Sequence, residues 1–172
     1  LMEPDGLHVG ARKIAVSTAG DVEGIRRFAL ETWQVRLTVS LHAANDMLRS
    51  RLVPLNRKYP LETLMDAIHE YQAVTGRQVT FEWTLIGDVN DSTRDAQELA
   101  DLLRGMKVSV NLIPLNPVEG IDFSPPSAQR CQAFQAALNK RGIVATLRKE
   151  RGQDIDAACG QLRRRRAVTP SD

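Results

Sequence analysis

Hydrophobic and polar positions along the chain follow two alternating patterns. Longer segments repeat hydrophobic residues at helical spacing, and shorter apolar runs between them have strand character. Because the two patterns alternate, we predict an α/β fold with parallel strands, either an open curved sheet or part of a barrel. The predicted strands are 14–17, 37–41, 79–86, 108–113 and 144–147. The predicted helices are 21–32, 60–75, 93–104 and one that follows 124–126 and stops at Gly142.

Polar segments follow four of the predicted strands. They are 17–20, 40–42, 87–91 and the residue Asn116. Ligands bind at the carboxyl ends of parallel strands, so we expect these segments to converge on one site. Each segment also has a plainer explanation. Ser17 could cap the next helix, His42 could be a satisfied loop histidine, and Asn116 could brace the turn before Pro117.

Charge is uneven along the chain although the net charge is only +2. Segment 140–166 holds nine Lys and Arg residues against three acids. A basic end of this kind favours an anionic partner, with RNA phosphate as the obvious class, although 163–166 could equally be a solvated tail. We therefore expect one domain over 1–162 and a basic tail over 163–172.

Several properties limit the class of protein. No apolar run approaches the ~18 residues of a membrane span, so no membrane partner is expected. Two cysteines, Cys131 and Cys159, make no disulfide framework and favour a reducing cytoplasm. Cys131 shares an apolar helical stripe with Phe134 and Leu138, which predicts packing in the core. The chain begins at Leu1 and is interpreted as a piece of something longer.

Four strings of residues carry a family resemblance. They are 39–46 (VSLHAAND), 52–60 (LVPLNRKYP), 111–117 (NLIPLNP) and 151–162 (RGQDIDAACGQL). Together they resemble the RlmN/Cfr family of radical-SAM methyltransferases, which methylate an adenine of large-subunit ribosomal RNA. The resemblance covers about 5–162. It implies the C-terminal part of a radical-SAM partial (β/α) barrel with parallel strands, lacking the N-terminal strands and an accessory domain.

The resemblance also implies roles for particular residues. The positions matching Ser17, Ser40, Leu41, His42 and Asn116 line the S-adenosylmethionine pocket in this family. The cysteine matching Cys159 accepts a methyl group from one S-adenosylmethionine. A second S-adenosylmethionine, cleaved at an iron–sulfur cluster, gives the radical that activates that methyl group. On local sequence alone, Cys159 would be a small buried residue beside Gly160.

Several family features are absent from the sequence. The Cys-x3-Cys-x2-Cys pattern that holds the [4Fe-4S] cluster does not occur, and Cys131 and Cys159 lie too far apart to supply it. No metal ligand is therefore expected in this chain. The Gly-Glu segment and the resolving cysteine of the family also lie upstream of the matching region, so a truncation accounts for every absence.

The function expected from the resemblance is methyl transfer to carbon 2 of an adenine in 23S ribosomal RNA. S-adenosylmethionine and a [4Fe-4S] cluster are the implied cofactors, with an electron donor as partner, and tRNA is left open as a second substrate. The alternatives are a Cfr-like carbon-8 activity and a non-catalytic remnant that binds S-adenosylmethionine or RNA. As a fragment, the chain is expected to be inactive alone.

Overall fold

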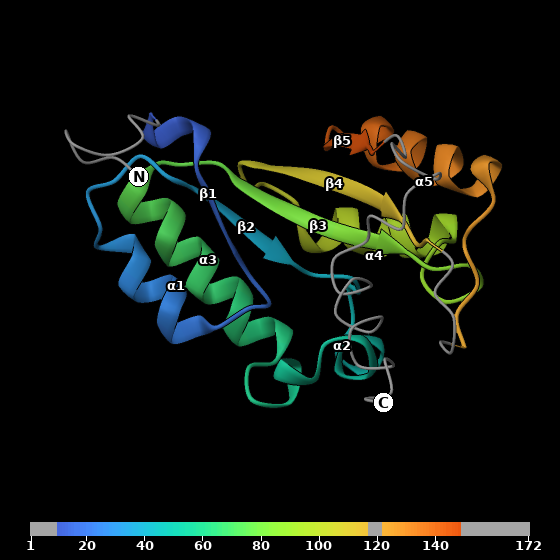
Figure 1. Ribbon diagram of the computed structural model, residues 1–172, viewed down its shortest axis with the longest axis horizontal. Coiled ribbons are helices and arrows are strands. Elements are labelled where there is room, and N and C mark those ends of the chain that lie inside the picture. Colours follow the sequence, from blue (N-terminus) through green and yellow to red (C-terminus); the bar gives the residue numbers. More distant parts are fainter. Residues whose placement is uncertain (1–9, 117–121, 149–172) are drawn as a thin grey trace, which may run out of the picture.

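The computed structural model describes residues 10–116 and 122–148. Five strands alternate with helices along these residues (Figure 1). The strands are β1 (Ala15–Thr18), β2 (Arg36–Ser40), β3 (Val79–Leu85), β4 (Val108–Pro114) and β5 (Val144–Leu147). The α-helices are α1 (Val22–Ala29), α2 (Asp46–Leu52), α3 (Leu61–Thr75), α4 (Thr93–Leu102) and α5 (Ala128–Lys140). Two short 3-10 helices are η1 (Ala11–Lys13) and η2 (Pro54–Arg57).

The strands form one parallel sheet in the order β1-β2-β3-β4-β5. Each strand therefore pairs with the next one in the chain, as in the wall of a barrel. Right-handed crossovers between such neighbours place successive helices on the same side of the sheet. The α/β fold with parallel strands that the sequence predicts is confirmed.

The hydrophobic core lies between the sheet and these helices. On β3, the buried positions alternate with half-buried ones, so that Phe81, Trp83 and Leu85 face the helices. Ile68 of α3 and Phe134 of α5 belong to the same buried cluster. The other face of the sheet carries the alternate residues, and this arrangement gives the molecule one apolar and one polar sheet face.

Capping residues mark two of the helix ends. Ser92 and Asp95 form a capping box at the start of α4, and Gly76 ends α3 with a φ of 66°. Cys131 is buried in α5, as its place on an apolar stripe predicts. Helix α1 stops at Ala29, three residues before its predicted end, because the Leu30 amide already bonds to carbonyls one turn back in 3-10 fashion.

The segment between β2 and α3 differs from the prediction. Helix α2 and η2 occupy it, whereas the sequence pattern predicted no helix between the strand 37–41 and residue 60. Asn45 caps α2 by accepting a hydrogen bond from the Leu48 amide at 2.9 Å. Seven residues show too little of a 3.6-residue period for a helix to be recognised from hydrophobic pattern alone.

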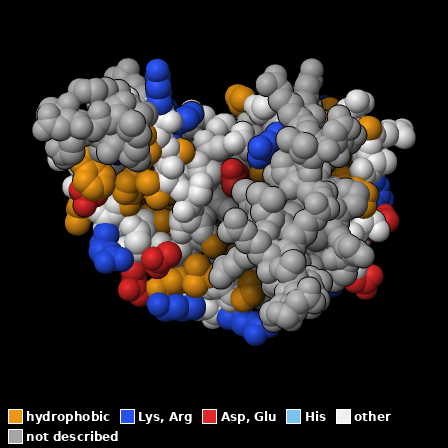
Figure 2. Space-filling view, viewed as in Figure 1, with side chains coloured by type: hydrophobic (Ala, Val, Ile, Leu, Met, Phe, Trp, Pro, Cys, Tyr) orange, Lys and Arg blue, Asp and Glu red, His pale blue; other side chains and the backbone are white. Residues whose placement is uncertain are grey.

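Charged side chains of both signs are mixed over α1 and α3, at the lower left of the view in Figure 2. Arg26 of α1 pairs there with Glu70 of α3 at 2.7 Å. Among the helices of the described ranges, none is both long and apolar enough to cross a membrane.

Candidate functional site

The carboxyl ends of β1 to β4 bring the four predicted polar segments to one edge of the sheet. The parallel strand order places these ends side by side. Beyond the strands, the Leu115 amide donates to the Leu85 carbonyl at 2.9 Å, which extends the β3–β4 pairing to Leu115, the residue before Asn116. The four segments therefore lie at the same edge of the sheet, as expected, and their contact with a shared ligand stays a prediction.

The polar face of the sheet is built from residues in register. One row across β2 to β5 is formed by Ser40, Glu82, Asn111 and Thr146. The row below it across β1 to β5 is formed by Ser17, Thr38, Thr80, Ser109 and Val144. Parallel sheets usually carry apolar residues on both faces because helices cover both. Hydroxyls, an amide and a carboxylate here favour contact with a polar ligand.

Ser17 lies on this polar face and is exposed. The capping role considered for Ser17 is not observed, because no side chain caps α1. Thr18 Oγ1 instead accepts hydrogen bonds from the amides of Gly20 and Asp21, just before the helix, both at 3.1 Å. Ser17 therefore keeps its hydroxyl on the same face as Thr38 of the next strand.

Ser40 and Leu41 end strand β2 in different surroundings. Ser40 is half-buried and shares its row with Glu82, whereas the Leu41 side chain is fully buried in the core. The Leu41 amide donates to the Glu82 carbonyl at 3.0 Å. Leu41 thus holds the strand end through its backbone and side chain, and only its neighbours Ser40 and His42 present polar side-chain groups.

His42 adopts a left-handed conformation, with a φ of 61°. Its Nδ1 accepts a hydrogen bond from the Thr84 amide at 3.0 Å, which places the ring proton on Nε2 in the neutral form. Burial, reinforced by the charge of Arg49, lowers the pKa of His42 to about 4. At neutral pH the ring is therefore an uncharged Nε2–H donor, held in one orientation by β3.

Arg49 of α2 is fully buried and ties the ends of β1 and β2 together. Its guanidinium donates to the carbonyl of Ala19 at 2.8 Å and to the carbonyls of Ser40 and Leu41 at 3.3 and 3.2 Å. A further bond, at 2.8 Å, reaches Asn56 Oδ1. Burial lowers the pKa of Arg49 to about 10, so it keeps its charge at neutral pH.

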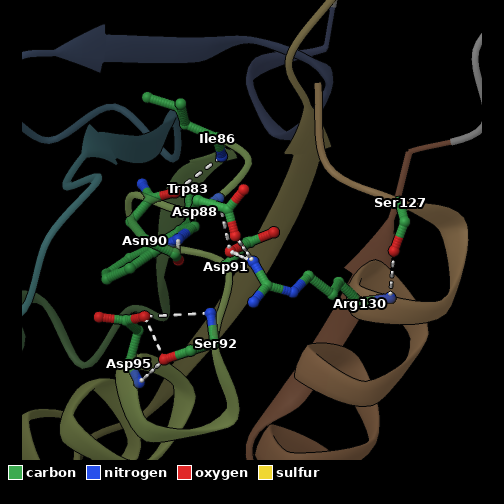
Figure 3. Close-up of polar contacts among 9 residues, drawn as sticks. All are labelled: Trp83, Ile86, Asp88, Asn90, Asp91, Ser92, Asp95, Ser127 and Arg130. Carbon is green, nitrogen blue, oxygen red and sulfur yellow. Dashed lines mark hydrogen bonds and ion pairs between the residues drawn. The ribbon is translucent and has the colours of Figure 1, made fainter. Parts of the chain in front are cut away.

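Asn90 connects the ends of β2 and β3, as Arg49 connects those of β1 and β2. Its amide nitrogen donates to the carbonyls of His42 and Thr84, both at 2.8 Å, and its Oδ1 accepts from the Ile86 amide at 2.7 Å. The indole of Trp83 donates to the Asn90 carbonyl at 3.1 Å (Figure 3). The segment 87–91, predicted to face a ligand, thus turns Asn90 inward to brace the backbone.

Arg130 connects this loop to helix α5. Its Nη1 lies 2.7 Å from Asp91 Oδ1 and 2.6 Å from Asp88 Oδ1, and these contacts raise the pKa of Arg130 (Figure 3). The Asp91 side chain is buried, and its Oδ2 has no partner in the part of the chain that the structure describes. The ion pair fixes the end of β3 against the start of α5.

The remaining predicted site residues are placed differently. Asn116 is exposed just beyond β4. Cys159 and the basic tail over 163–172 lie outside the described residues. Within 10–116 and 122–148, the single cysteine is the buried Cys131, and no three His, Cys, Asp or Glu side chains gather in a metal-binding group. These residues do not fit an iron–sulfur cluster, whereas the polar strand ends fit a nucleoside-like ligand.

The chain is similar in sequence to curated RNA methyltransferases, although no family model matches it. It is 53% identical over 166 residues to a probable dual-specificity RNA methyltransferase RlmN from Pelotomaculum thermopropionicum, covering 96% of this chain and 45% of the relative. It is 47% identical over 163 residues to the corresponding protein from Syntrophomonas wolfei, covering 95% and 46%. The chain therefore spans about half the length of these relatives.

One solved structure supports the same relationship, and a second one shares the fold. A radical SAM methyltransferase from Sphaerobacter thermophilus superposes with a TM-score of 0.89 at 56% identity, over 93% of this chain and 47% of that one. A domain of pyruvate-formate lyase-activating enzyme from Bacteroides vulgatus superposes with a TM-score of 0.58 at 18% identity, over 78% and 80%. The second likeness concerns the fold alone. The expected similarity to radical-SAM enzymes is confirmed.

Proposed function

We propose, on the premise that this chain belongs to the RlmN family of radical-SAM RNA methyltransferases, that it forms the C-terminal part of an enzyme methylating adenine at carbon 2 in 23S ribosomal RNA. The observation that carries the proposal is the polar face of the parallel sheet, with its strand ends fixed by Arg49 and Asn90. A polar sheet face with rigid ends provides hydroxyl and amide groups that can bind a nucleoside.

S-adenosylmethionine is the proposed ligand of this face. The Ser17 and Ser40 hydroxyls can donate to or accept from its ribose and carboxylate, and the neutral His42 ring offers one Nε2–H donor. Asn116, at the end of β4, offers an amide, and Leu41 holds the backbone between Ser40 and His42. When bound, S-adenosylmethionine supplies the methyl group and, on cleavage at a reduced [4Fe-4S] cluster, the radical.

Cys159 is the proposed methyl carrier. A cysteine acts as a nucleophile in its thiolate form, which nearby cations stabilise, and the sequence around Cys159 is rich in arginine. Cys131 is unsuited to this role because it is buried on the helix side of the sheet. The cluster ligands are assigned to a part of the protein outside this sequence, and the whole protein needs an electron donor to reduce the cluster.

The substrate and setting complete the proposal. The adenine lies in 23S ribosomal RNA, with tRNA as a further substrate to be tested because the relatives are called dual-specificity enzymes. The basic residues at 163–166 can contact RNA phosphates. The reaction is placed in the cytoplasm, where thiols stay reduced.

The test is methyl transfer by the complete protein, reconstituted anaerobically with iron and sulfide. We expect transfer to carbon 2 of adenine in ribosomal RNA, detected by mass analysis of the digested RNA. The Cys159→Ala variant is expected to lose all transfer, whereas Cys131→Ala, which alters a core position, is expected to retain it.

Three results would change the proposal. Methylation at carbon 8 would support the Cfr-like alternative. A complete protein that binds S-adenosylmethionine or RNA without turnover would support the non-catalytic remnant. Full activity of Cys159→Ala would refute the methyl-carrier role while leaving the cofactor site intact.

A further inference from the structure

Glu82 is the only acidic residue in the five strands of the sheet. It lies in the middle of β3, on the polar face, and the neighbours in its row are Ser40 and Asn111. Above and below it on the same strand stand Thr84 and Thr80. A negative charge thus sits at the centre of a surface whose nearest side chains carry neutral hydroxyl and amide groups.

Glu82 is half-buried as a residue, and its carboxylate has no hydrogen bond or ion pair to another described residue. Its neighbours behave differently, since Thr80 Oγ1 lies 3.2 Å from Ser109 Oγ. A ligand that covers this face would remove the carboxylate from water at a cost in free energy, and a cationic group of that ligand can offset the cost. The carboxylate is therefore the group of this face that most requires a cationic partner when a ligand binds.

The described arginines near β2 do not supply that partner. Arg36 lies on the polar face at the other end of β2, two residue pairs and ~13 Å of strand rise from the Glu82 row. The guanidinium of Arg49 is engaged by backbone carbonyls and Asn56. A neutral ligand group could be bound by the hydroxyls alone, whereas an unpaired carboxylate favours a cation.

We propose that Glu82 is the counter-ion for the positive charge of S-adenosylmethionine, and this inference rests on the proposed function. The cofactor carries two cationic groups, a sulfonium and an α-ammonium. Glu82 on β3 lies between the proposed contacts on β1 and β2 and the one that follows β4. It thereby makes the face selective for the charged cofactor over its neutral breakdown products.

The test measures binding affinities rather than turnover. Isothermal titration of the complete protein uses three ligands that share the adenosine part: S-adenosylmethionine with both cations, S-adenosylhomocysteine with the ammonium alone, and methylthioadenosine with neither. We expect Glu82→Gln to weaken S-adenosylmethionine binding by about tenfold and methylthioadenosine binding by less than about twofold. Retained methylthioadenosine binding also shows that the variant is folded.

Two further variants sharpen the result. Glu82→Asp keeps the charge and is expected to retain more affinity than Glu82→Gln. Glu62→Gln, at an exposed position of α3, is the matched control and is expected to bind all three ligands as the unaltered protein does. S-adenosylhomocysteine shows which cationic group of the cofactor contacts Glu82. If Glu82→Gln binds S-adenosylhomocysteine more weakly than the unaltered protein does, the contact is with the ammonium. If the two proteins bind it equally, the contact is with the sulfonium.

Equal affinity of Glu82→Gln and the unaltered protein for S-adenosylmethionine would overturn the inference alone. If RNA methylation were then lost, the Glu82 contact would be with the RNA. An unaltered protein that binds no S-adenosylmethionine would instead overturn the proposed function together with this inference.

Discussion

The two sides of the candidate site are held in place by different chemistry. On the β1–β2 side, the long charged side chain of Arg49 reaches from α2 to the carbonyl of Ala19, thirty residues away in the chain. On the β2–β3 side, the short neutral side chain of Asn90 bonds to groups of its own loop and to the carbonyl of His42. Both residues are fully buried.

The difference follows from distance and from the cost of burial. A guanidinium offers five donors in a fixed fork and can bridge several carbonyls at once, but it brings a charge into the interior. The direct bonds of Arg49 go to carbonyls and an amide, and burial accordingly lowers its pKa. The Asn90 side chain satisfies one backbone amide donor and two carbonyl acceptors without any charge. We therefore expect the β1–β2 side to be the more sensitive to substitution.

The largest effect is expected from Arg49→Met. This change leaves the carbonyls of Ala19, Ser40 and Leu41 without their donor, and we expect the free energy of unfolding to fall by about 3–5 kcal/mol. Urea unfolding of the complete protein measures it. Arg49→Lys keeps the charge but lacks the fork, so an intermediate loss is expected. If Arg49→Met lost less unfolding free energy than Asn90→Ala, the β1–β2 side would not be the more sensitive one.

A smaller loss is expected from Asn90→Ala. The Ile86 amide and the carbonyls of His42 and Thr84 would lose their partners, at a cost of about 2–4 kcal/mol. The same urea measurement applies, with Asn116→Ala as the exposed amide control that leaves stability unchanged. If both variants unfolded alike, the bracing role of Asn90 would be wrong.

The smallest effect on the free energy of unfolding comes from His42, which lies between Arg49 and Asn90, and it appears only at acidic pH. Its pKa is about 4 in the folded protein against 6.5 ordinarily, so between these values the unfolded chain binds the proton and the folded one does not. Its contribution is complete above pH 6.5 and is lost as pH falls toward 4, by about 2–3 kcal/mol.

His42→Asn is the matched variant for this prediction. Asparagine tolerates a positive φ and offers Oδ1 as an acceptor for the Thr84 amide, but it does not titrate. Unfolding free energies measured across this pH range are expected to fall less steeply for the variant. Parallel curves for the two proteins would show that His42 does not carry the acid dependence.

The sequence predicts the strands and long helices of this molecule better than it predicts the buried side chains, Arg49 and Asn90, that connect the strand ends. Strands and long helices repeat their hydrophobic positions often enough to be recognised, and Ser40, His42 and Asn116 stand out because they follow strands. Arg49 belongs to a seven-residue helix and looks like any surface arginine until the partners of its guanidinium are known. Such partners come from distant parts of the chain, which local pattern does not contain.

Glu82 shows a second limit of local pattern. In β3 it occupies an ordinary alternate position, the kind that faces water in many strands. The proposed role of Glu82 depends on which residues of β2 and β4 lie beside it. That register is a property of the folded sheet and cannot be deduced from β3 alone. Asn90 likewise belonged to a segment expected to face a ligand, yet its side chain points into the protein.

The strand order has a consequence for how the chain is made. Every strand pairs with the strand that precedes it in the sequence, so the contacts that build the sheet close loops of modest length. Domains begin to fold while synthesis continues, so a strand can pair with its predecessor before the following strand has been made. We expect the sheet to grow one strand at a time as it leaves the ribosome, in the order in which the strands are translated.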